Sequence, residues 1–160
     1  MKILAFDQAS VISGWSYFVD GEYVDSGVIK KDNDIPIETR LVEMGLSLCA
    51  KIKELHPDIV VMEDVQSQNN VKMVIDLARL QGCVLLYCAS KKIRSEIVRP
   101  TVWRGALHYR QGKGVKRDEL KKQSKDYVKE HFGFDKFSED RCEAICIGAA
   151  AQIIYGEKGD

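Results

Sequence analysis

Two short apolar runs, each followed at once by an acidic residue, constrain this chain most strongly. Residues 3–6 (Ile-Leu-Ala-Phe) precede Asp7, and residues 59–62 (Ile-Val-Val-Met) precede Glu63. An uninterrupted apolar run of this length is typical of a strand covered on both faces. A carboxylate at the end of a buried strand is costly unless it is paired, hydrated or bound to a cation. If the two strands are neighbours, we expect Asp7 and Glu63 to meet at one edge of the sheet.

The rest of the chain predicts an α/β fold in a single domain covering residues 1–160. We expect strands at 2–7, 15–19, 23–30, 59–62 and 96–98, and helices at 36–55, 70–90, 101–107, 115–132 and 139–155. The first three strands can form an antiparallel meander, with residues 10–14 as a turn before the second strand. The last two strands follow helices and would add in parallel. The prediction is a five-stranded mixed sheet with helices on both faces.

Two further acids lie on the last predicted helix. Asp140 and Glu143 are three residues apart in its first turn, a spacing that puts both on one face. With Asp7 and Glu63, three separate segments then offer carboxylates that can converge. Hard divalent cations prefer oxygen ligands, and two such ions can activate a water and stabilise the leaving oxygen of a phosphodiester. Two alternatives stay open: Asp7 could make an Asx-type turn, and Asp140 could favour the helix dipole.

Positive charge is concentrated in one part of the chain. The formal net charge is zero, but residues 91–129 carry thirteen Lys or Arg against four acids, so that segment is +9 and the remainder is −9. Such a division suits a protein that grips phosphates in one place and collects cations in another. A solvated helix with lysines on its outer face is the alternative interpretation.

Composition and the N-terminal segment predict a cytoplasmic protein. No run approaches the roughly 18 apolar residues of a membrane span, and the N-terminal segment turns acidic too early for a signal peptide. We therefore expect no membrane partner. The cysteines form no CxxC pair and no zinc-type cluster with histidine, so we expect them to be reduced and mostly buried. These cysteines are Cys49, Cys83, Cys88, Cys142 and Cys146.

Three segments together resemble the RuvC-type Holliday junction resolvases of the ribonuclease H-like nuclease superfamily, with short phage-borne members closest in character. They are residues 3–10 with Ser13-Gly14, residues 59–65 and residues 138–145. The resemblance implies a ribonuclease H-like fold and an endonuclease that cleaves branched DNA. It also implies two Mg²⁺ or Mn²⁺ ions per site, held by Asp7, Glu63, Asp140 and Glu143.

This sequence departs from the usual family pattern at three places. Glu143 stands where an Asp is usual, Gln8-Ala9 stands where Pro-Gly usually follows the first Asp, and Gln66 stands in the region of a base-stacking aromatic. We therefore expect a structure-selective nuclease with a relaxed sequence preference.

The resemblance also assigns roles to the basic segment and to one helix. Arg104, Lys113, Lys116 and Arg117 are expected to contact DNA, with Lys116 facing the scissile phosphate as a catalytic residue. Lys121, Lys122, Lys125 and Lys129 fit a solvated face equally well, and Trp103 is expected in the core or an interface. A homodimer through residues 70–90 is expected, because that helix is apolar around much of its circumference.

Other functions remain open at this point. A ribonuclease H-like nuclease that acts on RNA–DNA hybrids or flaps would use the same acids. A non-catalytic junction-binding protein would keep the fold without cleavage. A nucleotide-binding protein of the related actin and sugar-kinase fold is disfavoured, because residues 8–10 make a poor phosphate cradle and the chain has no second lobe.

Overall fold

The computed structural model describes residues 1–66 and 70–156, and its centre is a five-stranded sheet of order β3-β2-β1-β4-β5. The strands are β1 (Lys2–Asp7), β2 (Ile12–Val19), β3 (Glu22–Lys30), β4 (Ile59–Glu63) and β5 (Arg94–Val98). The first three strands pair antiparallel, whereas β4 adds in parallel to β1 and β5 adds in parallel to β4. The predicted mixed sheet is confirmed.

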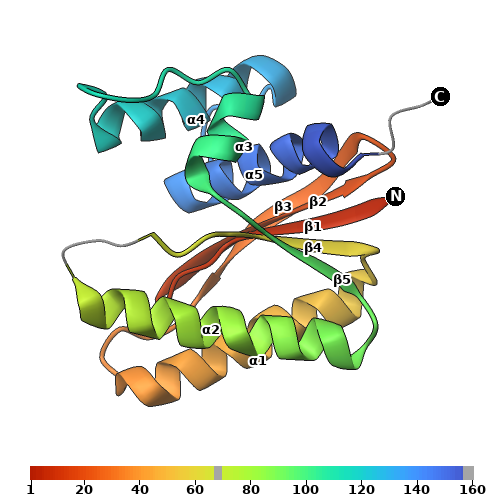
Figure 1. The fold of residues 1–160 in the computed structure, drawn as a ribbon, viewed down its shortest axis with the longest axis vertical. Coiled ribbons are helices and arrows are strands. Elements are labelled where there is room, and N and C mark those ends of the chain that lie inside the picture. The colour runs from red at the N-terminus through yellow and green to blue at the C-terminus, as the bar shows by residue number, and fades with distance from the viewer. Residues whose placement is uncertain (67–69, 157–160) are drawn as a thin grey trace.

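Helices cover both faces of this sheet (Figure 1). They are α1 (Ile37–Leu55), α2 (Val71–Ser90), α3 (Pro100–Ala106), α4 (Arg117–Phe132) and α5 (Glu139–Tyr155). The helices α1 and α2 pack against each other on one face, while α5 lies on β1 and β2 across the other. Both α3 and α4 pack on α5 and form an outer layer there.

The alternation of side chains along β1 and β4 divides the interior into two cores. On β1, Ile3 and Ala5 face the core under α5, whereas Leu4 and Phe6 face the core under α1 and α2. All four are fully buried, which explains why the strand reads as an unbroken apolar run. Burying each large side chain contributes about 1.5–3 kcal/mol, so both layers are firmly attached to the central strands.

Element boundaries differ from the sequence prediction by two residues or more in three places. The second strand begins at Ile12, so residues 12–14 are strand and not turn. The fifth strand begins at Arg94 and not at residue 96. The helix α4 begins at Arg117, two residues later than predicted. The first error has a clear cause: Gly14 resembles a turn residue, but here it allows α5 to approach the sheet closely.

The surface of α2 is unusually apolar. Its buried face carries Asp76, Leu80, Gln81, Val84 and Cys88. Among the described helices, α2 alone is long and apolar enough, by length and composition, to cross a membrane; core helices of soluble proteins pass the same test. Much of its apolar surface is left exposed within one copy of the chain.

The five cysteines are all free thiols. Cys88, Cys142 and Cys146 are buried, as predicted, whereas Cys83 is exposed and Cys49 is only partly buried. The expectation of mostly buried cysteines was therefore wrong for Cys83. That residue lies on α2 at the margin of its contact with α1, where it lines a hollow together with Leu41 and Val42.

Candidate active site

The pairing of β1 with β4 brings Asp7 and Glu63 together. The two strands run parallel in register, and the last pair is Phe6 with Met62. Asp7 and Glu63 are the next residues on each strand, so both carboxylates leave the sheet at the same edge. The juxtaposition predicted from the two apolar runs is confirmed.

Close packing of α5 on β2 places the other two acids at the same edge. Gly14 is the neighbour of Asp7 across the β1–β2 pair. A Cβ added at Gly14 would lie 2.0 Å from the carbonyl oxygen of Asp140, so only glycine permits this approach. The first turn of α5 therefore lies directly above the end of β1, and Asp140 and Glu143 face Asp7.

Two further contacts fix the position of α5 on β2. The Ser16 hydroxyl donates to the Ala144 carbonyl at 2.6 Å, inside the core. A Cβ at Gly148 would lie 2.5 Å from Ser16 Oγ and from the Phe18 ring. The start of the helix is capped by Ser138, whose side chain accepts from the Arg141 backbone N–H. Small residues thus set the helix-to-sheet distance on which the site depends.

The four acids line one cleft of about 550 Å³. Arg104, Arg117 and Lys121 also line it, as does Gln8. No histidine is found among the described residues that line the cleft. The cleft therefore combines carboxylates from β1, β4 and α5 with cationic side chains from α3 and α4.

Burial makes the carboxyl groups of Asp7, Glu63 and Glu143 reluctant to ionise, and neighbouring carboxylates add to this effect at Asp7 and Glu63. Burial raises the pKa of Asp7 well above its usual value, and the carboxylates of Glu143, Glu63 and Asp140 raise it further. Burial also raises the pKa of Glu143, against the opposing effect of Arg104. The pKa of Glu63 is raised by burial too, although Trp103 and Arg104 partly offset it.

The side chain of Glu63 is held by two residues of α3. The indole Nε1–H of Trp103 donates to Glu63 Oε1 at 2.8 Å, and Arg104 Nη2 lies 3.7 Å from the same oxygen. Trp103 is fully buried, and the Arg104 guanidinium lies over its ring at 4.8 Å from the centroid. The prediction that Trp103 belongs to the core is confirmed. Its hydrogen bond to an acid 40 positions away in the chain was not predicted.

The backbone at Glu63 is fixed from a second direction. Two buried glutamine amides, Gln8 Nε2 and Gln81 Nε2, donate to the Glu63 carbonyl at 2.6 and 3.1 Å. This carbonyl lies just beyond the last β1–β4 pair, where the backbone of β1 has turned away. Side chains from β1's exit loop and α2 replace the missing strand partner.

The donor set fits hard divalent cations. Carboxylate oxygens are the ligands that Mg²⁺ prefers, and a cation would relieve the repulsion among four acids in a partly buried cleft. The residues that would hold it are Asp7, Glu63, Asp140 and Glu143. Within residues 1–66 and 70–156, no three His, Cys, Asp or Glu side chains are arranged tightly enough to hold an ion as they stand. The acids line the cleft without being closed around one point.

The predicted DNA-contacting residues divide into two groups. Arg104 and Arg117 line the cleft, whereas Lys113 and Lys116 are exposed and do not line it. Lys116 is the residue before α4 and does not reach the cleft lining. Its catalytic role stays a prediction. The sequence leaves Lys121 open between a DNA contact and a solvated face, and the structure places it in the lining of the cleft, paired with Glu139 at 2.6 Å.

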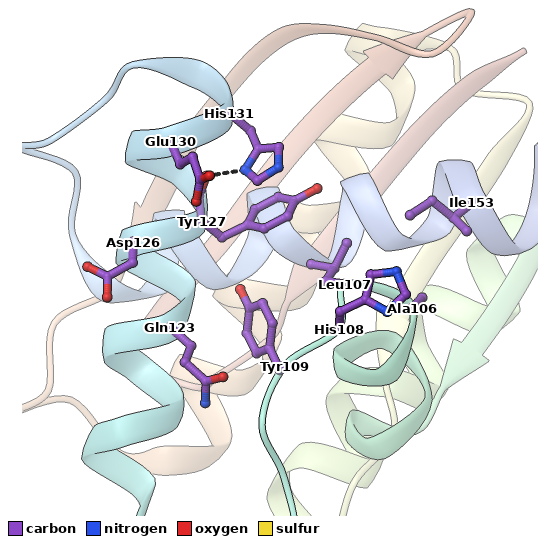
Figure 2. Close-up of a pocket in the computed structure, with 10 residues that line it drawn as sticks. All are labelled: Ala106, Leu107, His108, Tyr109, Gln123, Asp126, Tyr127, Glu130, His131 and Ile153. Carbon is purple, nitrogen blue, oxygen red and sulfur yellow. Dashed lines mark hydrogen bonds between the residues drawn. The ribbon is translucent and has the colours of Figure 1, made fainter.

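A second hollow lies between α3, α4 and the end of α5, and its residues are shown in Figure 2. It measures about 440 Å³ and contains His108 and His131, but none of the four acids. The His131 ring stacks on Tyr127 at 4.0 Å, and its Nδ1 lies 3.0 Å from the Tyr127 carbonyl. The histidines of α3's exit and α4 are thus remote from the cleft.

Comparison with known proteins places the chain in a family. The sequence model for "Crossover junction endodeoxyribonuclease RuvC" matches residues 6–116. A RuvC of Erythrobacter litoralis is 30% identical over 92 residues, which cover 55% of this chain and 56% of the relative. A RuvC of Thermomicrobium roseum is 27% identical over 96 residues, which cover 58% of this chain and 59% of the relative. The matched segment thus spans little more than half the length of these curated relatives.

Solved structures extend the likeness over the whole fold, including α5. The chain superposes on Thermus thermophilus RuvC in complex with a Holliday junction substrate, with a TM-score of 0.79, 12% identity and coverage of 97% of this chain and 94% of the other. For Fowlpox virus resolvase with its Holliday junction DNA, the TM-score is 0.64 and the identity is 14%, with coverage of 99% of this chain and 100% of the other. The fold is ribonuclease H-like, as predicted. Because the family's sequence model covers well over half of its residues, this chain belongs to the crossover junction endodeoxyribonuclease RuvC family.

Proposed function

We propose that this protein is a divalent-cation-dependent endonuclease that cleaves four-way DNA junctions. One observation carries the proposal: carboxylates from β1, β4 and α5 line a single cleft together with Arg104, Arg117 and Lys121. The structures of Thermus thermophilus RuvC and Fowlpox virus resolvase, both described with Holliday junction DNA, support the choice of substrate.

The chemistry follows from what each group in the cleft can do. Asp7, Glu63, Asp140 and Glu143 would hold two Mg²⁺ or Mn²⁺ ions, which would supply charge stabilisation for phosphodiester hydrolysis. Trp103 and Arg104 keep the Glu63 carboxylate pointing into the cleft. Arg117 and Lys121 attract the phosphodiester and neutralise part of its charge. No histidine lies among the described cleft residues, so the acids, with the cations that they would hold, are the groups placed to act on the phosphodiester.

The wider DNA contact follows from the charge of α4 and the segment before it. Lys113 and Lys116 are exposed at its approach, and we propose that they bind phosphates outside the cleft. Gln66 lines the cleft near Glu63, and an amide stacks on bases more weakly than an aromatic ring does. We therefore propose recognition of junction shape with a relaxed sequence preference, in the cytoplasm of a bacterial or phage-infected cell.

Two symmetric cuts across a junction require two active sites, and we propose that α2 supplies the dimer contact. Its outer side carries Val71, Ile75 and Leu86, with exposed fractions of 68%, 44% and 73%. Ala78 and Gly82 lie on the same face by helical periodicity, and a Cβ at Gly82 would meet nothing within 4 Å. Such a face lets two copies of α2 approach closely across a two-fold axis.

The dimer is tested by Gly82→Arg, which would bury two charges near the axis. We expect sedimentation velocity to show a dimer for the wild type and a monomer for the variant at the same concentration. Lys53→Arg, on the exposed side of α1, is the control. A wild-type monomer at every concentration, or a dimer that is unchanged by Gly82→Arg, would contradict α2 as the contact.

The activity is tested by incubating the protein with an end-labelled four-way junction, a linear duplex and an RNA–DNA hybrid in Mg²⁺, Mn²⁺ or EDTA. We expect paired cuts in the junction, little cleavage of the duplex, and none in EDTA. Preferred cleavage of the hybrid would change the substrate class while keeping the mechanism. Cleavage that persists in EDTA would overturn the mechanism.

A further inference from the structure

One side-chain oxygen of a residue that lines the cleft has no hydrogen-bond partner among the described residues. Gln8 is 8% exposed and lines the cleft with the four acids. Its Oε1 atom is buried and accepts no hydrogen bond from any described residue. Buried polar atoms are rarely left in this state, so the orphaned acceptor points to a group that is absent from the protein itself.

The amide can be oriented in only one way. Gln8 Nε2 lies 2.6 Å from the Glu63 carbonyl oxygen and donates to it. The flipped amide would place two oxygens at that distance, with repulsion instead of a hydrogen bond. Oε1 is therefore the free end, and it belongs to the residue next to Asp7 in the chain.

A neutral oxygen has a specific advantage at this position. Asp7 already experiences three neighbouring carboxylates, and a further acid would add repulsion in the metal-free protein. A carboxamide oxygen is an acceptable ligand for a hard cation and carries no charge. A carboxamide oxygen can therefore complete the coordination shell of a cation without adding charge repulsion to the metal-free folded protein.

We propose that Gln8 Oε1 is an oxygen ligand of the divalent cation held by Asp7 and Glu63. The assignment rests on one part of the proposed function, namely that this cleft binds a divalent cation, and does not depend on which DNA is cleaved. The hydrogen bond from Gln8 Nε2 to the Glu63 carbonyl then links a ligand in the residue after β1 to the backbone of a ligand on β4. One side chain thereby sets the spacing of the two strand ends.

The chain offers a matched control in Gln81. It is the same residue type, is also 8% exposed, and donates to the same Glu63 carbonyl, but it does not line the cleft. Gln8→Met and Gln81→Met each remove one donor to that carbonyl and preserve side-chain length. Only Gln8→Met also removes the unpartnered oxygen of a residue that lines the cleft.

The experiment titrates Mn²⁺ into the wild type and both variants by isothermal calorimetry without DNA, after circular dichroism has confirmed folding in EDTA. We expect Gln8→Met to weaken Mn²⁺ binding about 10–100-fold, and Gln81→Met to change it less than about threefold. Equal losses in both variants would reassign the effect to the Glu63 carbonyl. Wild-type affinity in Gln8→Met, or no Mn²⁺ binding by the wild type, would overturn the assignment.

A second measurement needs no variant and covers the case in which Gln8→Met fails to fold. In wild-type protein labelled with ¹³C, addition of Mg²⁺ should shift the Gln8 Cδ resonance strongly and the Gln81 Cδ resonance weakly. An unmoved Gln8 signal at saturating Mg²⁺ would overturn the proposal. Junction cleavage by the wild type separates the two proposals: binding that depends on Gln8 without cleavage refutes only the nuclease, and cleavage with an unmoved Gln8 signal refutes only the ligand.

Discussion

The acid cleft and the hollow of Figure 2 are similar in size but opposite in their chemistry. In the cleft, four carboxylates face one another, and burial opposes the ionisation of at least Asp7, Glu63 and Glu143. In the hollow, His131 stacks on Tyr127 and lies against that residue's own carbonyl. This difference indicates which of the two concavities binds a ligand. The cleft holds like charges that need a cation, whereas the contacts in the hollow are explained by packing.

The same difference has a thermodynamic side. Groups that repel one another lower the stability of the metal-free protein, and a cation that binds only the folded state restores it. The close approach of α5 to the sheet, which Gly14 in β2 and Gly148 in α5 allow, brings the acids into this proximity. We infer that the carboxylates of the cleft lower the free energy of unfolding of the metal-free protein, and that the residues of the hollow have no comparable effect.

The largest expected effect comes from neutralising a cleft acid. Glu63→Gln keeps the size of the side chain but removes its charge, so the cation site loses a ligand. Metal catalysis contributes several kcal/mol of charge stabilisation, so the single-turnover cleavage rate should fall at least about 100-fold. A rate within tenfold of the wild type would remove Glu63 from the reaction.

Removing the support behind that acid should have a smaller effect. Trp103→Phe deletes the Nε1–H donor to Glu63 Oε1 but keeps a buried aromatic ring. Outer partners of metal ligands contribute about 10–100-fold, so cleavage at limiting Mn²⁺ should fall by that factor. Because the ligands themselves remain, excess Mn²⁺ should restore most of the rate. A defect that high Mn²⁺ does not reduce would mean that Trp103 acts only through folding.

Sequence alone predicted the two strand-end acids because each closes an apolar run, and such a run has few places in a fold other than a central strand. It also predicted that α5 carries Asp140 and Glu143 on one face, since this follows from helical periodicity. These two facts contain most of the site. The meeting of Asp7 and Glu63 needed only the parallel pairing of β1 with β4.

What sequence did not predict depends on distances between elements. Ser13-Gly14 has the composition of a turn, and only the contact with the Asp140 backbone shows why a glycine lies in β2. The position of Lys121 in the cleft, with Lys116 outside it, depends on where α4 starts and how it is rotated on α5. The roles of Trp103 and Gln8 depend on hydrogen bonds between segments whose spacing no local pattern encodes.

The charge of the cleft should also be visible in stability without any substrate. Burial raises the pKa of Asp7, so the folded protein binds this proton more tightly than the unfolded chain does. Stability in EDTA should therefore fall as pH rises from the ordinary carboxyl pKa of 3.8 through the raised folded value. Asp7→Asn removes this loss, so its Tm should exceed that of the wild type at pH 8 by about 2–4 °C for each kcal/mol relieved.

Two comparisons sharpen that prediction. The advantage of Asp7→Asn in EDTA should shrink between pH 8 and pH 4.5, where more of the wild-type carboxyl is protonated. Added Mg²⁺ should raise the Tm of the wild type and leave that of the variant nearly unchanged. A variant that is less stable than the wild type in EDTA at pH 8 would show that Asp7 is already compensated within the protein.

The smallest effect is expected in the hollow of Figure 2. His131 is exposed and touches no cleft residue through any described hydrogen bond. His131→Ala should change the free energy of unfolding by no more than about 0.5 kcal/mol, as for most surface substitutions. The junction cleavage rate should stay within twofold of the wild type. A tenfold loss would give the hollow a part in catalysis and erase the contrast between the two regions.

The most direct test of the four-carboxylate site is a crystal grown with Mn²⁺ and measured at a wavelength where manganese scatters anomalously. The arrangement predicts an anomalous peak in the cleft, at a bonding distance of about 2.0–2.3 Å from oxygens of Asp7, Glu63 and at least one acid of α5. The same peak should vanish in crystals of Glu63→Gln grown under identical conditions. Manganese bound only elsewhere, or a cleft that stays empty at saturating Mn²⁺, would contradict the assignment of these acids as the cation site.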